Sequence, residues 1–165
     1  MIRCAALLIP LLTLPAAAHA QGRYRVAIST PGSSRVIVAE FRPCVPAEGS
    51  DCGGWIDKEA DSASAIAPVV TNAVSPDARD SVSIRNGVVV LTRLTSPRRQ
   101  DTRRLRSAFG APVAVAISSD SRYAFVAYRA PSGDRALISM IDLSTRRSVF
   151  SLPLSHGVAG IAALP

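Results

Sequence analysis

The chain has 165 residues, enough for one domain with a buried core. Nineteen basic against twelve acidic side chains give a formal net charge of +7, and aromatic residues make up only 5% of the chain. Few aromatics stand among the basic residues, which disfavours nucleic acid as a partner. Lys58 is the only lysine, and such an arginine bias is a common result of a GC-rich genome that names no partner by itself.

Residues 1–20 have the composition of a secretory signal peptide. Arg3 supplies the positive start, an apolar run follows from Ala5 to Ala18, and Ala18-His19-Ala20 is a cleavage motif. A membrane anchor is disfavoured because the run is shorter than the roughly 20 residues that a span requires. We therefore predict cleavage before Gln21, no membrane span, and a periplasmic or secreted location.

Two cysteines remain after cleavage, Cys44 and Cys52. In an exported protein such a pair predicts a disulfide, which would close a short loop and stabilise the fold by roughly 2.5 kcal/mol in a chain-entropy treatment. A metal or redox site is the alternative. The spacing matches neither C-x-x-C chemistry nor zinc ligation, and no histidine lies nearby, so the disulfide is favoured.

Alternating acids follow the cysteines at Asp57, Glu59 and Asp61, as in a calcium-binding loop. An EF-hand loop counted from Asp57 needs glycine at its sixth position and an acid at its twelfth. This chain has Ser62 and Pro68 there. A solvated acidic loop is therefore the favoured interpretation, and we expect no metal.

Internal repeats organise the rest of the chain. Ala67-Pro68-Val69 recurs as Ala111-Pro112-Val113, and Pro76–Arg79 aligns with Ser119–Arg122, so two copies lie roughly 44 residues apart. Each copy holds short apolar runs separated by glycine, proline, serine and aspartate, which is typical of antiparallel strands. We predict a single domain over 21–165, with repeats near 24–66, 67–110 and 111–155 and an extra strand at 157–164.

A period of about 44 residues with four strands is typical of the blades of a β-propeller. We therefore predict an all-β fold of about three four-stranded antiparallel blades. Propellers close with roughly 4–8 blades, so we expect an open or incomplete array, a ring completed by oligomerisation, or descent from a longer ancestor. Exposed strand edges near Arg25–Ser29 and Val158–Ala163 are expected to pair with another chain.

The third repeat resembles the YVTN-type β-propeller repeat. The resemblance rests on four segments: Pro112–Ile117, Ser119–Ser121, Tyr123–Ala127 and Ser139–Thr145. Ser121 stands where the family usually has glycine, and Tyr128 where it has asparagine. The resemblance covers only this repeat and implies a propeller fold in an exported protein. Because such blades serve many functions, it implies no single activity.

Two features are candidate binding elements. Trp55, the only tryptophan, follows two glycines and either packs in the core or stacks on a ligand. A basic run in the second repeat forms either a surface for an anion or acidic partner, or an outer strand whose charges discourage edge pairing. The run consists of Arg93, Arg98, Arg99, Arg103, Arg104 and Arg106.

Catalysis finds little support in the sequence. No G-x-S-x-G, H-E-x-x-H or glycine-rich phosphate motif occurs, and Ser155 and His156, as neighbours on a strand, are expected to point to opposite faces. Asp120 and Asp142 are candidate acids, but both lie in predicted turns, where aspartate caps the backbone. We therefore expect no catalytic, cofactor-binding or metal-binding residues.

Together these features favour an exported, non-catalytic β-propeller-like binding module of the periplasm. Its expected partner is a protein, either a second copy or another periplasmic chain, engaged through open blade edges, and an anionic ligand is a further candidate. The alternative is an accessory subunit or a remnant of a periplasmic propeller enzyme of the quinone-dependent oxidation type, which the resemblance to YVTN-type blades suggests.

Overall fold

The structure is a computed structural model that describes residues 22–32, 36–43, 53–60, 69–96 and 99–165. The predicted signal peptide and the predicted disulfide between Cys44 and Cys52 lie outside these residues and stay predictions. The described part is built of strands and turns, with no helix and hence no helix that could cross a membrane. The all-β prediction is confirmed.

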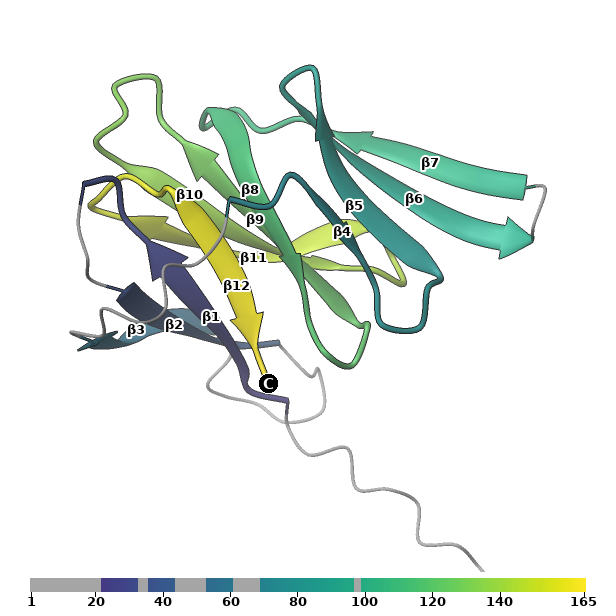
Figure 1. The fold of residues 1–165 in the computed structure, drawn as a ribbon, viewed down its shortest axis with the longest axis horizontal. Helices are drawn as coiled ribbons and strands as arrows, with labels where there is room; N and C mark the ends of the chain where they lie inside the picture. The colour runs from purple at the N-terminus through teal and green to yellow at the C-terminus, as the bar shows by residue number, and fades with distance from the viewer. Residues whose placement is uncertain (1–21, 33–35, 44–52, 61–68, 97–98) are drawn as a thin grey trace, which may run out of the picture.

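Three antiparallel sheets of four strands make up the described residues (Figure 1). Sheet 1 has the order β12-β1-β2-β3, with bounds Gly160–Leu164, Tyr24–Ser29, Val36–Arg42 and Gly53–Ala60. Sheet 2 has the order β4-β5-β6-β7, with bounds Asn72–Val74, Asp80–Arg85, Val88–Ser96 and Arg99–Leu105. Sheet 3 has the order β8-β9-β10-β11, with bounds Ala111–Ile117, Tyr123–Arg129, Ala136–Asp142 and Arg147–Leu154. This is the predicted open, propeller-type array.

Sheet 3 lies between the other two sheets. Its first strand, β8, packs on β12 of sheet 1 and on β4 and β5 of sheet 2, and β11 approaches β3. Figure 1 shows sheet 1 at the left, sheet 3 in the middle and sheet 2 at the right. Sheets 1 and 2 therefore cover the two faces of sheet 3, and each keeps one face on which no described sheet packs.

Two hydrophobic cores form on the two faces of β9, because alternate side chains of a strand point to opposite faces and those of β9 are nearly all apolar. Phe125 points toward sheet 1 and lies against Phe41, with ring centroids 5.3 Å apart. Val126 points toward sheet 2 and lies in the same cluster as Val82 and Leu91. The middle sheet is thus stabilised from both sides.

The predicted C-terminal strand is present and is the outermost strand of sheet 1. β12 pairs antiparallel with β1, in a register that runs from Arg25 opposite Leu164 to Ser29 opposite Gly160. β12 lies at the end of sheet 1 and keeps one edge on which no described strand pairs, but Arg25–Ser29 lies between two strands, so the prediction of an open edge there is wrong. The physical reason is that the unpaired N–H and C=O groups of one edge satisfy those of the other.

One turn is built twice, at Ser75–Asp80 and at Ser118–Tyr123. In each, the first serine Oγ donates to the aspartate two residues later over 2.6 Å and accepts the N–H of the last residue over 2.9 or 3.0 Å. Ala78 and Ser121 occupy equivalent left-handed positions, with φ of 57° and 61°. The two turns also touch, because the Asp77 N–H donates to Ser121 Oγ over 3.2 Å.

Candidate functional site

The predicted basic run is divided between the two faces of sheet 2. Arg103 pairs in register with Leu91, which lies in the core against sheet 3, so Arg103 stands on the face toward sheet 3. Arg104, one residue along the strand, pairs with Val90 and stands on the opposite face. The run is therefore not a single surface.

Arg93 serves as a tie between sheets 2 and 3. Its guanidinium donates to both carboxylate oxygens of Asp80, over 2.9 and 3.0 Å, and to the carbonyl of Leu143 in sheet 3 over 2.6 Å. Hydrogen bonding to Asp80, against the opposing effect of burial, raises the pKa of Arg93 further. Arg98 and the side chain of Arg99 lie outside the described residues.

Three exposed arginines gather on the free face of sheet 2, and we call Arg85, Arg104 and Arg106 the arginine face. Arg85 pairs in register with Val88, and Arg106, directly after the end of β7, lines the same hollow as these two residues. Arg104 stands beside Val90 in the next row. The rows are about 7 Å apart and neighbouring strands about 4.8 Å apart, so the three long side chains reach a common centre.

These arginines surround a hollow of about 370 Å³. Its floor is apolar, and its rim adds an amide and a hydroxyl that can donate hydrogen bonds. The lining consists of Arg85, Asn86, Val88, Val90, Thr102, Arg104 and Arg106. The lining contains no carboxylate, so the hollow is positively charged over its whole rim.

Arg85 was missed by the sequence analysis because it lies outside the basic run. The signal was nevertheless present in Asn86-Gly87, a dipeptide typical of a two-residue hairpin turn. Both residues have positive φ, 51° and 71°. Such a turn sets Arg85 opposite Val88 and thereby on the face that carries Arg104.

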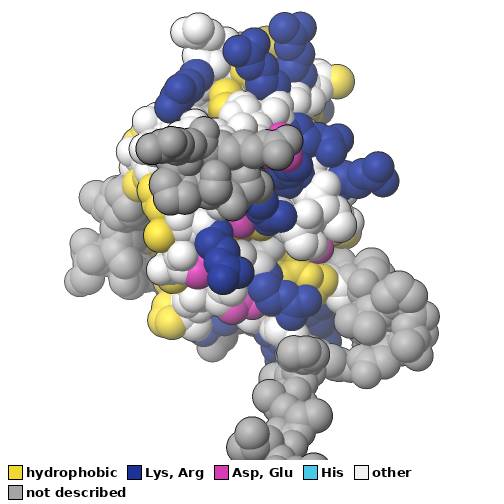
Figure 2. Space-filling model, turned by 90° about the vertical axis from the view of Figure 1, so that its right-hand side faces the viewer, with side chains coloured by type: hydrophobic (Ala, Val, Ile, Leu, Met, Phe, Trp, Pro, Cys, Tyr) yellow, Lys and Arg dark blue, Asp and Glu magenta, His cyan; other side chains and the backbone are white. Residues whose placement is uncertain are grey.

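Several other described arginines form ion pairs, whereas the three of the arginine face do not. Arg93 pairs with Asp80, Arg146 with Asp101, and Arg23 and Arg42 with Glu40. Within the described residues, no carboxylate or hydrogen-bond acceptor engages the arginine face. Figure 2 views the molecule from the side of sheet 2 and shows many more basic than acidic side chains there.

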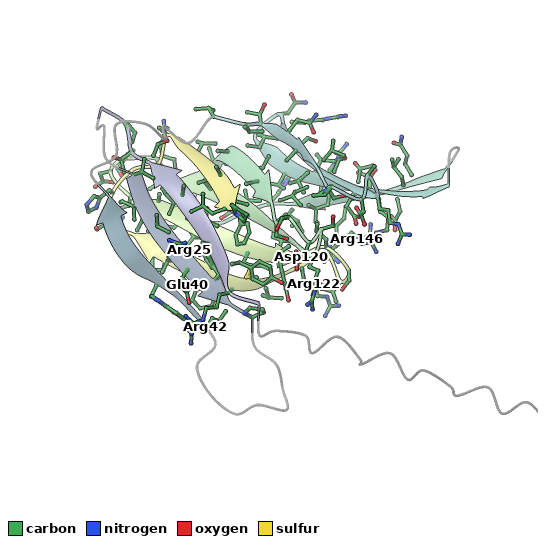
Figure 3. All side chains as sticks on the ribbon, turned by 60° about the horizontal axis from the view of Figure 1, so that its bottom comes forward. Arg25, Glu40, Arg42, Asp120, Arg122 and Arg146 are labelled. Carbon is green, nitrogen blue, oxygen red and sulfur yellow. The ribbon has the colours of Figure 1, made fainter. Side chains whose placement is uncertain are left out.

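Trp55 lies on β3, beside Arg42, whose guanidinium is 4.6 Å from the centre of the tryptophan ring. The ring is half-buried and belongs to none of the buried apolar clusters. Arg42 also bonds to Glu40, a buried carboxylate that Arg23 approaches as well. Figure 3 shows Arg25, Glu40 and Arg42 together on sheet 1. The ligand-stacking role of Trp55 stays a prediction, and one ring face already holds a cation.

The carboxylates of the two candidate acids are engaged in turns. Burial acts to raise the pKa of Asp120, but hydrogen bonds from Ser118, Tyr24 and the backbone outweigh it and hold the pKa below its usual value. Burial likewise acts to raise the pKa of Asp142, but hydrogen bonds from Ser144 and the backbone outweigh it and lower that pKa. Both groups are therefore ionised near neutrality and hold no proton to donate.

A second hollow, of about 620 Å³, lies at the edge between β1, β12 and the Asp120 turn. Tyr24 OH donates to Asp120 Oδ2 there over 2.7 Å, and burial, followed by this hydrogen bond, raises the pKa of the phenol. Arg122 and Arg23 stand on its rim. The phenol is protonated and the carboxylate ionised, an arrangement that joins sheet 1 to sheet 3.

Ser155 and His156 contact each other, contrary to the prediction that they point apart. Ser155 Oγ lies 2.6 Å from His156 Nδ1, and both residues are exposed. The prediction was wrong because β11 ends at Leu154, and the alternation of a strand does not extend into the bend that follows. In the described part of the chain, no carboxylate contacts His156 to orient it, as a catalytic triad requires.

No protein-family model and no curated protein sequence matches the chain. Among solved structures, hydrazine synthase of Kuenenia stuttgartiensis has a TM-score of 0.44 and 14% sequence identity, covering 78% of this chain and 36% of that chain. TolB from Acinetobacter baumannii has a TM-score of 0.33 and 16% identity, covering 77% of this chain and 29% of that chain. The chain thus spans well under half of either structure.

Proposed function

We propose that the chain is an exported, non-catalytic binding module of the periplasm, and that it binds an acidic protein on the free face of sheet 2. The observation that carries the proposal is the arginine face, which has no acidic partner among the described residues. Export rests on the signal-like residues 1–20. The absence of catalysis is an inference from the sequence, which has none of the catalytic motifs sought.

Exposed apolar side chains accompany the arginines on this face. Val74 is 60% exposed and Leu94 is 49% exposed, and their registers place both on the side of the sheet that carries Arg104. Interfaces commonly combine apolar contact with arginine, whereas an apolar residue alone on a surface needs no explanation. Together they form a surface suited to a partner with both carboxylates and apolar side chains.

A second copy of the chain is the less favoured partner. Completing a ring with a second copy would bring the free face of sheet 2 against the free face of sheet 1. That face carries Arg25 and Arg42 around Glu40, in addition to Arg23 nearby. Among the described side chains of that face, Arg23 and Arg42 already engage Glu40, which leaves it little able to pair with the arginine face, so a different, acidic chain fits better.

The test places a photoreactive amino acid at either of two neighbouring positions in the mature chain, expressed in the periplasm. Position Thr102 lies on the arginine face and position Arg103 on the opposite face. We expect a cross-linked protein from position 102 that is absent at position 103 and that decreases at high salt, because exposed charges are screened.

The matched variants are the triple substitution R85Q/R104Q/R106Q, which should abolish the cross-link, and R103Q, which should keep it. Equal cross-linking from both positions, or a mature chain that sediments as a lone monomer in periplasmic extract, would contradict the proposal. A homodimer cross-linked through position 102 would replace the acidic partner by a second copy.

A further inference from the structure

We propose that the hollow of the arginine face is a binding site for one tetrahedral dianion, a phosphate group. The inference concerns the same face as the proposed function and goes beyond it, because the group that it names is a phosphate and not a carboxylate of an acidic protein. It stands on the convergence of Arg85, Arg104 and Arg106 over a floor formed by Val88 and Val90.

The number and chemistry of the guanidinium groups favour a tetrahedral dianion. A single carboxylate offers two oxygens in one plane and one charge, which one arginine satisfies through a bidentate pair. Three arginines, one from β5 and two from β7 and the residue after it, supply three positive charges and more N–H donors than one carboxylate accepts. A phosphate carries oxygens in four directions and close to two negative charges.

The remaining lining fits the same ligand. Thr102 and Asn86 add a hydroxyl and an amide N–H₂ at the rim, and both groups donate hydrogen bonds to anionic oxygens. Val88 and Val90 keep the floor of the hollow apolar, so the field of the arginines is less screened there than on an open surface. No lining residue carries a negative charge that would repel the ligand.

Internal ion pairing does not already satisfy these arginines. Arg93, on the neighbouring strand β6 and on the other face, is paired with the carboxylate of Asp80. None of the three arginines of the hollow has such a partner among the described residues. Three like charges held together cost energy unless an anion joins them, and the apolar floor gives no compensation.

The experiment is calorimetric titration of the mature, full-length chain with inorganic phosphate, sulfate and chloride at constant ionic strength. We expect phosphate to bind saturably with one site, and chloride to show no saturable binding. Phosphate binding should strengthen between pH 5 and pH 8, because inorganic phosphate loses its second proton within that range while arginine stays charged. Sulfate binding should not change over that range.

The variants R85Q, R104Q and R106Q should each weaken phosphate binding by roughly tenfold, which is about 1.4 kcal/mol, since each removes a charge-assisted hydrogen bond. R103Q is the matched control, because Arg103 is equally exposed on the same strand but on the other face. It should bind as the parent does. Equal losses in R103Q and R104Q, or phosphate no tighter than chloride, would overturn the site.

Two further arms distinguish the source of the phosphate group. Vesicles with phosphatidic acid, compared with phosphatidylcholine vesicles, test a lipid headgroup, and glycerol phosphate tests a soluble ester. Vesicle binding lost in R104Q assigns the headgroup, and binding of the soluble ester alone assigns a free ligand. Phosphate binding without a cross-linked protein would support this site and contradict the proposed function, whereas the reverse result would contradict this site alone.

Discussion

Sheet 3 and sheet 2 have the same four antiparallel strands and the same serine–aspartate turn, but they bury their side chains differently. Strand β9 of sheet 3 is buried at every position from Tyr123 to Tyr128, whereas β5 of sheet 2, from Asp80 to Arg85, alternates apolar and polar residues. The difference follows from position, because sheet 3 is covered on both faces and sheet 2 on one.

The free face of sheet 2 accordingly mixes polar, basic and apolar side chains, whereas the two faces of β9 are almost wholly apolar. Its strands place Ser81, Thr92 and Thr102 in one row, with Arg85 and Arg104 nearby. Val74 and Leu94 stand exposed on the same face. A face of this composition is compatible with water or with a polar partner.

The largest expected effect comes from removing core volume in sheet 3. Phe125→Ala should lower the free energy of unfolding by about 3–5 kcal/mol, because Phe125 is fully buried and packs on Phe41. Leu94→Ala, on the free face of sheet 2, should change it by less than about 0.5 kcal/mol. Urea unfolding measures both, and a similar loss in the two variants would show that Leu94 is covered.

The next largest loss of stability should come from removing Arg93, which links sheet 2 to sheet 3. Arg93→Gln should destabilise the chain by about 1–2 kcal/mol, because it leaves the buried Asp80 carboxylate without its pair, and partial exposure of Arg93 reduces the loss. R103Q is the control, with no measurable change expected. If R93Q unfolded at the same urea concentration as the parent, Arg93 would contribute nothing to holding the sheets together.

At acid pH the free energy of unfolding should depend on pH through the aspartates in the turns, because the apolar side chains of the two cores do not titrate. The pKa values of Asp77, Asp120 and Asp142 are all lowered in the folded chain by hydrogen bonds from serine hydroxyls and backbone N–H groups. A lowered folded pKa stabilises the fold above the unfolded value, about 3.9, and this contribution is lost as the pH falls through the folded pKa.

Urea midpoints measured from pH 6 down to pH 2 should therefore fall below pH 4. Asp120→Asn should reduce that dependence, since its side chain does not titrate, while starting from a lower stability at pH 6. A pH profile parallel to that of the parent chain would show that Asp120 contributes nothing to the acid sensitivity.

The strands themselves could be predicted from the sequence because each is a local apolar run between turn residues, as Ala111–Ile117 and Tyr123–Arg129 show. The pairing of β12 with β1 could not, because strands at opposite ends of the chain leave no local signal of their partner. Contact between Ser155 and His156 depends on where β11 ends, which strand alternation alone does not give.

The arginine face was predicted in part for a similar reason. The close spacing of arginines in the sequence predicted Arg104 and Arg106 as surface residues, but it grouped them with Arg93 and Arg103. Because alternate side chains of a strand point to opposite faces, those two lie on the other face of sheet 2. Register decides which residues share a face, and a shift by one residue reverses the assignment. Arg85 enters the site only through the register of β5 and β6.

The smallest expected change in stability comes from the left-handed residues of the two equivalent turns, Ala78 and Ser121. Ala78→Gly should stabilise the chain by about 0.5–1 kcal/mol, because glycine adopts a φ of 57° without the steric cost that alanine has. Ser121→Gly gains the same relief at φ 61° but loses the hydroxyl that accepts the Asp77 N–H, so its net change should be close to zero. Thermal or urea unfolding measures the difference between the two variants, and equal stabilisation would show that the bond from sheet 2 to Ser121 contributes nothing.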